Sequence, residues 1–189
     1  TVDELIDSLI IKSANDAAVA IAEKISGSEK KFVLKMNDYA EKLNLENTNF
    51  ANPHGLPNKA NLSTAYDIFK LSSRIILDFP EHLHRFKKTK VKIKGKNYTT
   101  HNTLLKKYDH YIGLKTGYTR KSGFQISLLS INDDKYLLGI YFGGNSAKER
   151  NNKINFLMNK YKNKDVSKNK KTKKLIVKNE KKSTSTSNY

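Results

Sequence analysis

Two short motifs hold residue types suited to serine-type acyl transfer: Ser13-Ala14-Asn15 and, 102 residues later, Lys115-Thr116-Gly117. A serine hydroxyl must lose a proton before it attacks an amide, so it needs a base within reach. Ser13 follows an apolar helical run, and Lys115 follows residues 111–114, which are typical of a strand. The structural alternative is that Ser13 and Asn15 only cap a helix and that Lys115-Thr116-Gly117 only ends a strand.

The elements that precede residue 86 are expected to be helical. Thr1 and Glu4 have the spacing of a capping box ahead of an amphipathic stretch. Gly27 is placed to end the helix that follows Ser13. Ser63 is expected to cap a later helix.

The hydrophobic period becomes that of strands after residue 88. Alternation around Gly95 predicts a small hairpin in the Lys-rich segment 87–107, and two apolar runs at 124–131 and 136–142 predict a second hairpin. Ala147–Tyr161 is expected to form a closing amphipathic helix. Its apolar residues are Ile154, Phe156, Leu157 and Met158.

These patterns divide the chain in two. Residues 1–161 are expected to form one partial domain, with a helical part at 1–86 and a sheet plus a helix at 87–161. Residues 162–189 are rich in Lys, Ser and Thr, and we expect them to be disordered because they hold too little apolar surface to pack.

Charge and composition limit the classes of function. The net charge is +18, and residues 87–121 carry eleven basic side chains against one acidic side chain. Nearly all of the basic residues are Lys, whereas nucleic-acid readers favour Arg, so no specific nucleic-acid partner is expected. No apolar run is long enough to span a bilayer. His82 and His84 lack the company of other metal ligands, and we expect neither a metal nor a cofactor.

Four segments resemble, in order, the D-alanyl-D-alanine carboxypeptidases, which are low-molecular-mass penicillin-binding proteins. They are residues 13–18 (SANDAA), 52–56 (NPHGL), 63–67 (STAYD) and 113–119 (GLKTGYT). The resemblance implies an α/β fold of the α+β type, like that of β-lactamases and transpeptidases. In that fold a helical subdomain packs on an antiparallel sheet with flanking helices. It also implies a periplasmic or cell-surface enzyme that removes the terminal D-Ala from peptidoglycan stem peptides through an acyl-enzyme.

The resemblance assigns catalytic roles to three residues. Ser13 would relay a proton towards the leaving D-Ala amine, and Asn15 would hold the substrate backbone. Lys115 would bond Ser13 across a cleft and attract the substrate carboxylate. Ser13 and Lys115 are therefore expected to approach within hydrogen-bond reach.

The resemblance also implies substrate-binding residues beyond Lys115. Thr116 would offer its hydroxyl to the carboxylate, and Gly117 would leave room for a peptide along the strand edge. The backbone N–H of Tyr118 would be an oxyanion donor. Arg150 would grip the terminal carboxylate, the alternative being an ordinary helix-surface arginine.

The nucleophile and general base of the family, a Ser-x-x-Lys upstream of Ser13, are missing from this chain. Ser28-Glu29-Lys30-Lys31 and Ser167-Lys168-Asn169-Lys170 have the spacing but stand downstream, and we interpret both as chance matches. The start has no initiator Met and no basic signal sequence, so an N-terminally truncated fragment is expected, with the first part of the fold missing.

Three hypotheses follow. In the first, the chain is the downstream part of a carboxypeptidase, which would bind D-Ala-D-Ala peptides, and β-lactams if an upstream segment completes it. In the second, it is a non-catalytic remnant that binds peptide weakly. In the third, it is a cationic module that binds cell wall or another anionic polymer. A class A β-lactamase fits less well, because no Glu follows Ser13 where the deacylating carboxylate of that class is expected.

Overall fold

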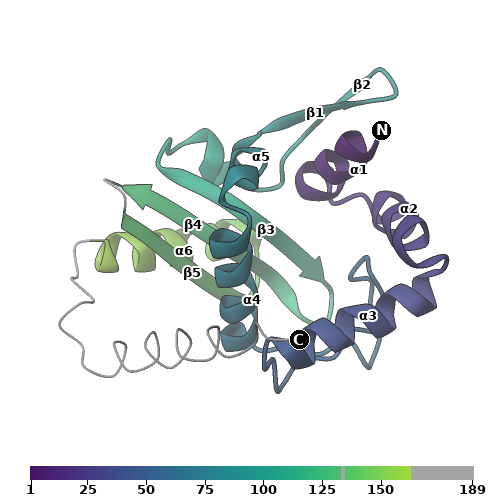
Figure 1. Cartoon of the computed structure of the whole chain (residues 1–189). Coiled ribbons are helices and arrows are strands. Elements are labelled where there is room, and N and C mark those ends of the chain that lie inside the picture. The colour runs from purple at the N-terminus through teal and green to yellow at the C-terminus, as the bar shows by residue number, and fades with distance from the viewer. Residues whose placement is uncertain (133–134, 163–189) are drawn as a thin grey trace, which may run out of the picture.

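The computed structural model describes residues 1–132 and 135–162, which form a helical layer beside an antiparallel sheet (Figure 1). The helical elements are α1 (Val2–Asp7), the π-helical turn η1 (Ser8–Lys12), α2 (Asn15–Ser26), α3 (Glu29–Lys42), α4 (Ala65–Asp78), the 3-10 turn η2 (Pro80–His82), α5 (Leu83–Lys87), the 3-10 turn η3 (Thr103–Lys106) and α6 (Ala147–Tyr161). The strands are β1 (Lys90–Ile93), β2 (Lys96–Thr99), β3 (Tyr111–Thr119), β4 (Gly123–Asn132) and β5 (Lys135–Gly144). The tail expected over 162–189 lies, apart from Lys162, outside the described residues.

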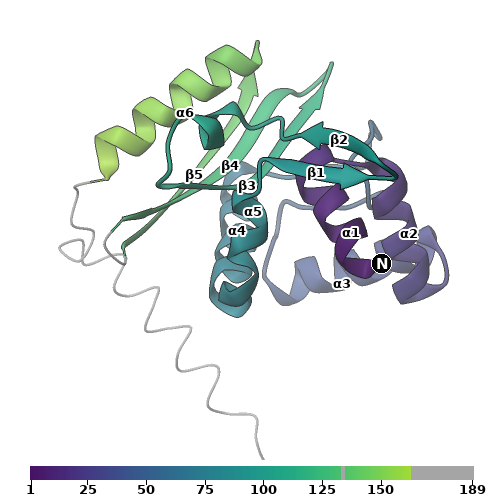
Figure 2. The same ribbon diagram turned by 90° about the horizontal axis from the view of Figure 1, so that it is seen from above.

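The main sheet has the order β3-β4-β5, with antiparallel neighbours, and is covered on both faces. Figure 2 shows α6 on one face and α4 with α5 on the other. One apolar core joins Ile126 and Leu128 of β4 to Ile154 and Met158 of α6. A second core joins the opposite face of the sheet to α4 and α5. The expected fold class, helices packed on an antiparallel sheet with flanking helices, is confirmed.

Local sequence signals place most helix ends. Thr1 and Glu4 form the expected capping box, and Gly27 ends α2 at a φ of 77°, where a side chain would be strained. The prediction for α4 is wrong by one residue, since Thr64, and not Ser63, accepts the backbone N–H of Asp67. The Ser63 hydroxyl pairs instead with that of Thr48, 2.9 Å away.

The closing helix has the predicted bounds but not the predicted buried face. Ile154 and Met158 are buried, whereas Phe156 is 62% exposed. The polar residues Arg150 and Asn151 are buried together with Ile154 and Met158. The register of α6 on β4 and β5 decides which face is covered, and apolar spacing alone does not fix that register.

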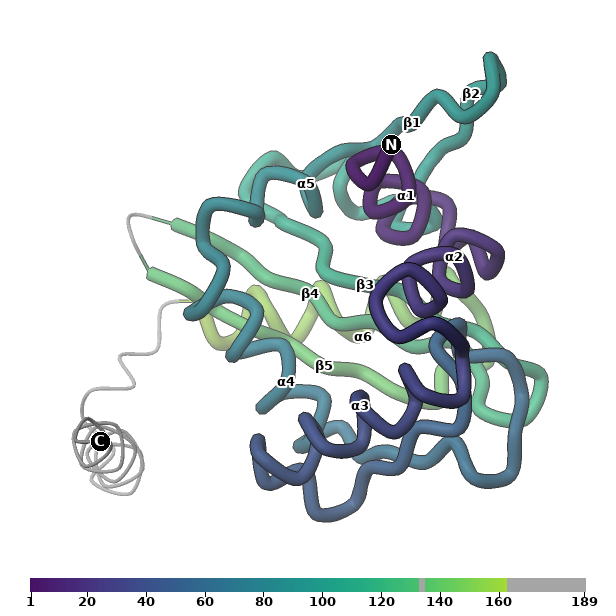
Figure 3. Tube along the Cα trace, turned by 45° about the vertical axis from the view of Figure 1, so that its right-hand side comes forward, coloured from purple at the N-terminus to yellow at the C-terminus, as the bar shows by residue number. Residues whose placement is uncertain are grey.

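The Lys-rich hairpin β1–β2 packs on η1, immediately before Ser13. This confirms the hairpin expected in segment 87–107. Figure 3 shows it beside α1. Lys12 at the end of η1 places its Nζ 5.0 Å from the centre of the Tyr98 ring. None of the helices within 1–132 and 135–162 is long and apolar enough to cross a bilayer.

Candidate active site

Ser13 occupies a left-handed turn between η1 and α2. Its φ of 58° and ψ of 45° cost a non-glycine residue roughly 1–2 kcal/mol. Its backbone N–H closes the wide π-helical turn on Ser8 O. A strained backbone of this kind persists only where the surrounding structure holds it in place, and such residues are concentrated at functional sites.

The N-terminus of α2 rules out the capping alternative for the first motif. The N-cap residue is Ala14, and it has no side-chain capping bond. Ser13 therefore does not cap the helix, and its hydroxyl is directed elsewhere. Asn15 is the first residue of α2 and is exposed beside this turn.

Lys115 reaches Ser13 from the sheet. Its Nζ donates to Ser13 Oγ at 2.8 Å and to the backbone carbonyl of Thr116 at 2.9 Å. The two residues stand 102 positions apart and belong to different layers. The approach expected from the sequence is confirmed.

Burial changes the protonation of this lysine. Desolvation lowers the pKa of Lys115 from its ordinary 10.5 to about 8, because a buried ammonium loses hydration. Within the described ranges, none of the ion pairs gives Lys115 a carboxylate partner that would oppose this shift. The result is an amine that can exchange a proton close to neutral pH, in contact with a hydroxyl.

The remainder of the second motif runs along the edge strand β3. Among the strands of residues 1–132 and 135–162, none pairs with its outer edge in the main sheet, and such an edge is suited to pairing with an extended peptide. Gly117 is exposed, and a Cβ there would meet only the Gln125 side chain, at ordinary contact distance. Tyr118 is 60% exposed, and its ring contacts the ring of Phe124 at a tilt of 32°, with the ring centres 4.2 Å apart.

Arg150 lies on the α6 side of the sheet and is 2% exposed. Its guanidinium donates to Asn151 Oδ1 at 2.9 Å and 3.0 Å. Longer bonds of 3.5 Å and 3.4 Å reach the carbonyls of Gln125 and His101. The alternative of an exposed surface arginine is therefore wrong. Among the hydrogen bonds of the described residues, none joins Arg150 to Ser13 or Lys115.

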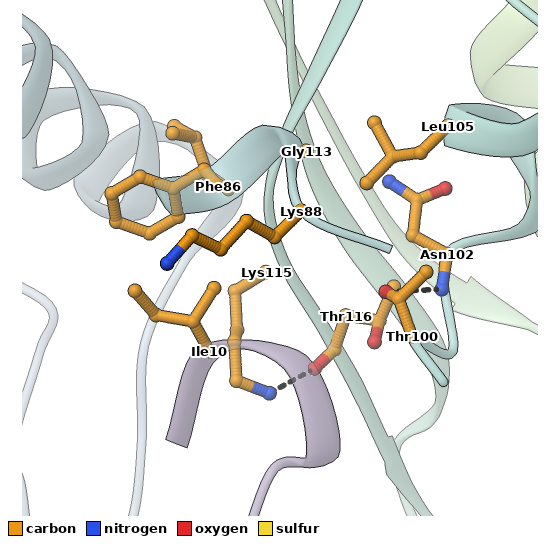
Figure 4. Close-up of a pocket in the computed structure, with 10 residues that line it drawn as sticks. Ile10, Phe86, Lys88, Thr100, Asn102, Leu105, Gly113, Lys115 and Thr116 are labelled. Carbon is orange, nitrogen blue, oxygen red and sulfur yellow. Dashed lines mark hydrogen bonds between the residues drawn. The ribbon is translucent and has the colours of Figure 1, made fainter. Parts of the chain in front are cut away.

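A small pocket open to solvent lies behind Lys115 (Figure 4), and most of its lining was not predicted. It is lined by Ile10, Phe86, Lys88, Thr100, Asn102, Leu105, Gly113, Leu114, Lys115 and Thr116. Among the new members, only Asn102 has a local sequence signal, because Asn commonly caps a short helical turn. In the structure its Oδ1 does accept the Leu104 N–H. The other new members are apolar or belong to distant segments that only the fold brings together.

Comparison with known proteins agrees with this geometry. The family model described as D-alanyl-D-alanine carboxypeptidase matches residues 1–146. The chain belongs to the D-alanyl-D-alanine carboxypeptidase family. The resemblance given by the four sequence segments is thereby confirmed at the level of the family.

Individual members of the D-alanyl-D-alanine carboxypeptidase family are similar over most of the chain. D-alanyl-D-alanine carboxypeptidase DacD of Escherichia coli is 38% identical over 151 residues, which are 79% of this chain and 39% of that protein. DacF of Bacillus subtilis is 36% identical over 160 residues, 82% of this chain and 41% of that protein. The chain thus spans about two fifths of the length of these two curated relatives.

Solved structures give the same result for the fold. Penicillin-binding protein 5 from Haemophilus influenzae superposes with a TM-score of 0.81 at 31% identity, covering 84% of this chain and 46% of that one. Penicillin-binding protein D2 from Listeria monocytogenes, in its cefotaxime-bound form, gives 0.78 at 31% identity, covering 84% of this chain and 65% of that one.

Proposed function

We propose that this chain supplies part of the active site of a serine-type D-Ala-D-Ala carboxypeptidase, which removes terminal D-Ala from peptidoglycan stem peptides. The observation that carries the proposal is the 2.8 Å contact between Lys115 Nζ and Ser13 Oγ. A strained serine and a desolvated lysine meet there although they belong to separate layers. The proposed place of action is the periplasm or the cell surface, where such peptides are found.

The proposed chemistry uses the contact as a proton relay. Ser13 passes a proton towards the leaving D-Ala amine, and Lys115 holds the hydroxyl and replaces that proton. The pKa of about 8 for Lys115 suits this task, because transfer is most efficient when donor and acceptor titrate near the working pH. In its charged form, Lys115 has no carboxylate partner among the described residues and attracts the carboxylate of the substrate.

The proposed substrate lies along the outer edge of β3. Thr116 offers its hydroxyl to the carboxylate, Gly117 leaves space for the peptide, and the Tyr118 N–H serves as an oxyanion donor. Asn15, exposed at the start of α2, holds the substrate backbone. Arg150 is proposed to attract the terminal carboxylate from the far side of the strand, after exchanging its longer bonds to the backbone.

The nucleophile and its base are proposed to come from a Ser-x-x-Lys segment outside these residues. Ser28 is an N-cap, and its Oγ accepts the Lys31 N–H at 3.3 Å, which supports a purely structural role for that match. The match at Ser167 lies outside the described residues. One side of α4 exposes three large apolar residues, Tyr66, Phe69 and Leu77. We propose that a segment of polypeptide outside the described residues covers this side of α4.

Covalent labelling with a fluorescent penicillin tests the proposal. The chain alone should show no covalent band, because removing a catalytic serine costs roughly a million-fold in a serine protease. Co-expressed with an added Ser-x-x-Lys segment from a family member, the complex should label on that added segment. A Lys115→Met variant is the matched control and should abolish that labelling. A band on this chain alone would contradict the proposal.

One observation favours the second candidate, a cationic cell-wall or anionic-polymer binding module. Lys90, Lys92 and Lys94 are exposed on the β1–β2 hairpin, and no described salt bridge includes them. Binding to a soluble polyanion should then weaken steeply with salt, and a Lys90→Ser/Lys92→Ser/Lys94→Ser variant should lose it. Polyanion binding without any penicillin labelling of the co-expressed complex would favour this candidate over the carboxypeptidase.

A further inference from the structure

β3 contains a β-bulge immediately before the motif lysine. Gly113 pairs with Leu128 and Lys115 pairs with Ser127, so Leu114 and Lys115 together oppose a single residue of β4. A bulge of this kind inserts one residue and re-aims the side chains that follow it.

The bulge decides which face of the sheet carries Lys115. Leu114 packs in the core on the α4 and α5 face. Strict alternation would send the next side chain to the opposite face, towards α6 and away from Ser13. Ser127, the partner of Lys115, bonds Ser72 of α4 at 2.9 Å, so this pair faces the helical layer. Leu114 and Lys115 therefore share a face only because the register shifts between them.

Asn102 fills the space on the other side of the strand, next to the bulge. It is 4% exposed, and its Oδ1 accepts the Leu104 N–H at 3.1 Å. A Cβ added to Gly113 would lie 2.6 Å from Asn102 Nδ2 and 3.1 Å from Leu105. Asn102 and Leu105 thus pack directly against the bare backbone of Gly113, the last residue before the extra one.

We propose that Asn102, packed on Gly113, is a positioning residue that holds the bulge in β3 and so turns Lys115 towards Ser13. This inference rests on the proposed function, in which Lys115 must contact Ser13. It concerns the geometry of Lys115 and can be tested without turnover.

The test follows the titration of Lys115 by competitive acetylation. The full chain is labelled with acetic anhydride over a range of pH, and the modification of each lysine is measured by mass spectrometry. The exposed Lys121 serves as an internal reference. Lys88, the other cation of the pocket, has its charge compensated by Asp7 Oδ2 at 2.5 Å. A Lys88→Met variant removes any remaining influence of that charge.

Two single variants disturb the contact between Asn102 and Gly113, one at each of the two residues. Asn102→Ser keeps a short polar side chain that can cap the Leu104 N–H but empties the space before Gly113. Gly113→Ala adds the Cβ that collides with Asn102. In both, the midpoint of Lys115 labelling should move from about 8 towards the ordinary 10.5, because the amine turns towards solvent. The double variant, with the added methyl in the emptied space, should return the midpoint towards 8.

Gly139→Ala is the matched control on the same sheet. Its Cβ would lie 2.7 Å from Met158 Sδ and 2.8 Å from Ile154 Cδ1, so it strains the core to a similar degree. Gly139 is on β5, which β4 separates from the bulged strand β3, and its Cβ would collide with α6 and not with Asn102. It should lower the melting temperature and leave the Lys115 midpoint unchanged. The inference is overturned if the variants at Asn102 and Gly113 also lower only the melting temperature, or if the double variant gives no return. A failure of penicillin labelling with a normal Lys115 response would count against the proposed function alone.

Discussion

Lys115 and Arg150 are both desolvated cations beside the same strands, yet their surroundings differ. Lys115 faces the helical layer, where it touches the hydroxyl of Ser13 and one carbonyl. Arg150 lies on the α6 side, where its guanidinium bonds the Asn151 amide oxygen and two backbone carbonyls. Both pKa values are lowered by burial.

The difference shows that burial has different consequences for the protonation of a lysine and of an arginine. For Lys115 the pKa falls to about 8, so its proton becomes exchangeable near neutral pH. For Arg150 burial lowers the pKa from a value so high that the guanidinium stays charged. The helical-layer side of the sheet therefore holds a proton-exchanging group, and the α6 side holds a permanent charge. Four experiments test this contrast.

The largest effect is expected when Lys115 is replaced by arginine, the side-chain type present at position 150. Lys115→Arg keeps the positive charge but removes a proton that can be exchanged at neutral pH. In the complex co-expressed with a Ser-x-x-Lys segment, the acylation rate should fall by about 10²–10⁴-fold. Rates measured with fluorescent penicillin check this, with Lys121→Arg as the control. A nearly normal rate would show that charge alone matters at this position.

The next effect concerns stability on the α6 side. Arg150→Ala removes a buried side chain and takes both of its donors away from Asn151 Oδ1. The free energy of unfolding should fall by about 1–3 kcal/mol, the usual cost of a buried polar group left unpaired. Urea unfolding measures it, with Arg120→Ala, at an exposed site, as the control. An unchanged midpoint would mean that Arg150 is held without contributing to the fold.

A smaller effect is expected from the pH dependence of stability. Lys115 has a folded-state pKa near 8, below its unfolded value of 10.5, so its burial penalty is present below pH 8 and disappears as the pH rises. The wild type should gain about 2 kcal/mol relative to Lys115→Met between pH 7 and 9.5. Tyr111, whose folded pKa is raised to about 12 by burial, acts in the opposite direction only above pH 10. Parallel curves for the two proteins in urea unfolding would contradict the lowered pKa.

The smallest effect is expected at Ser13. Ser13→Ala removes an acceptor that stabilises the charged amine, so the pKa of Lys115 should fall further below about 8. Competitive labelling measures the change, and Asn151→Ala, on the other side of the sheet, should leave it unaltered. A rise in the Lys115 midpoint would show that the hydroxyl does not hold the ammonium.

Much of the molecule could be predicted because its signals are local. The Thr1 capping box, the Gly27 helix end, both hairpins and the bounds of α6 depend on residues within a few positions of one another. The family was recognisable from four short segments in order. Errors arose where two local choices were nearly equal, as between Ser63 and Thr64 for the cap of α4. The buried face of α6 was another such choice, settled by contacts with β4 and β5.

The order of the residues establishes which chemistry-bearing side chains are present and in which elements they stand. That Lys115 faces Ser13 follows from the packing of distant segments, because the direction of Lys115 depends on a register shift between two strands and not on alternation within one. The same holds for the lowered pKa of Lys115, which results from burial between layers that lie far apart in the chain. Arg150 is buried for a similar reason, because its guanidinium is held by carbonyls of β4 and of the segment before η3. Contacts of this kind depend on how distant segments pack, and the order of the residues does not specify them locally.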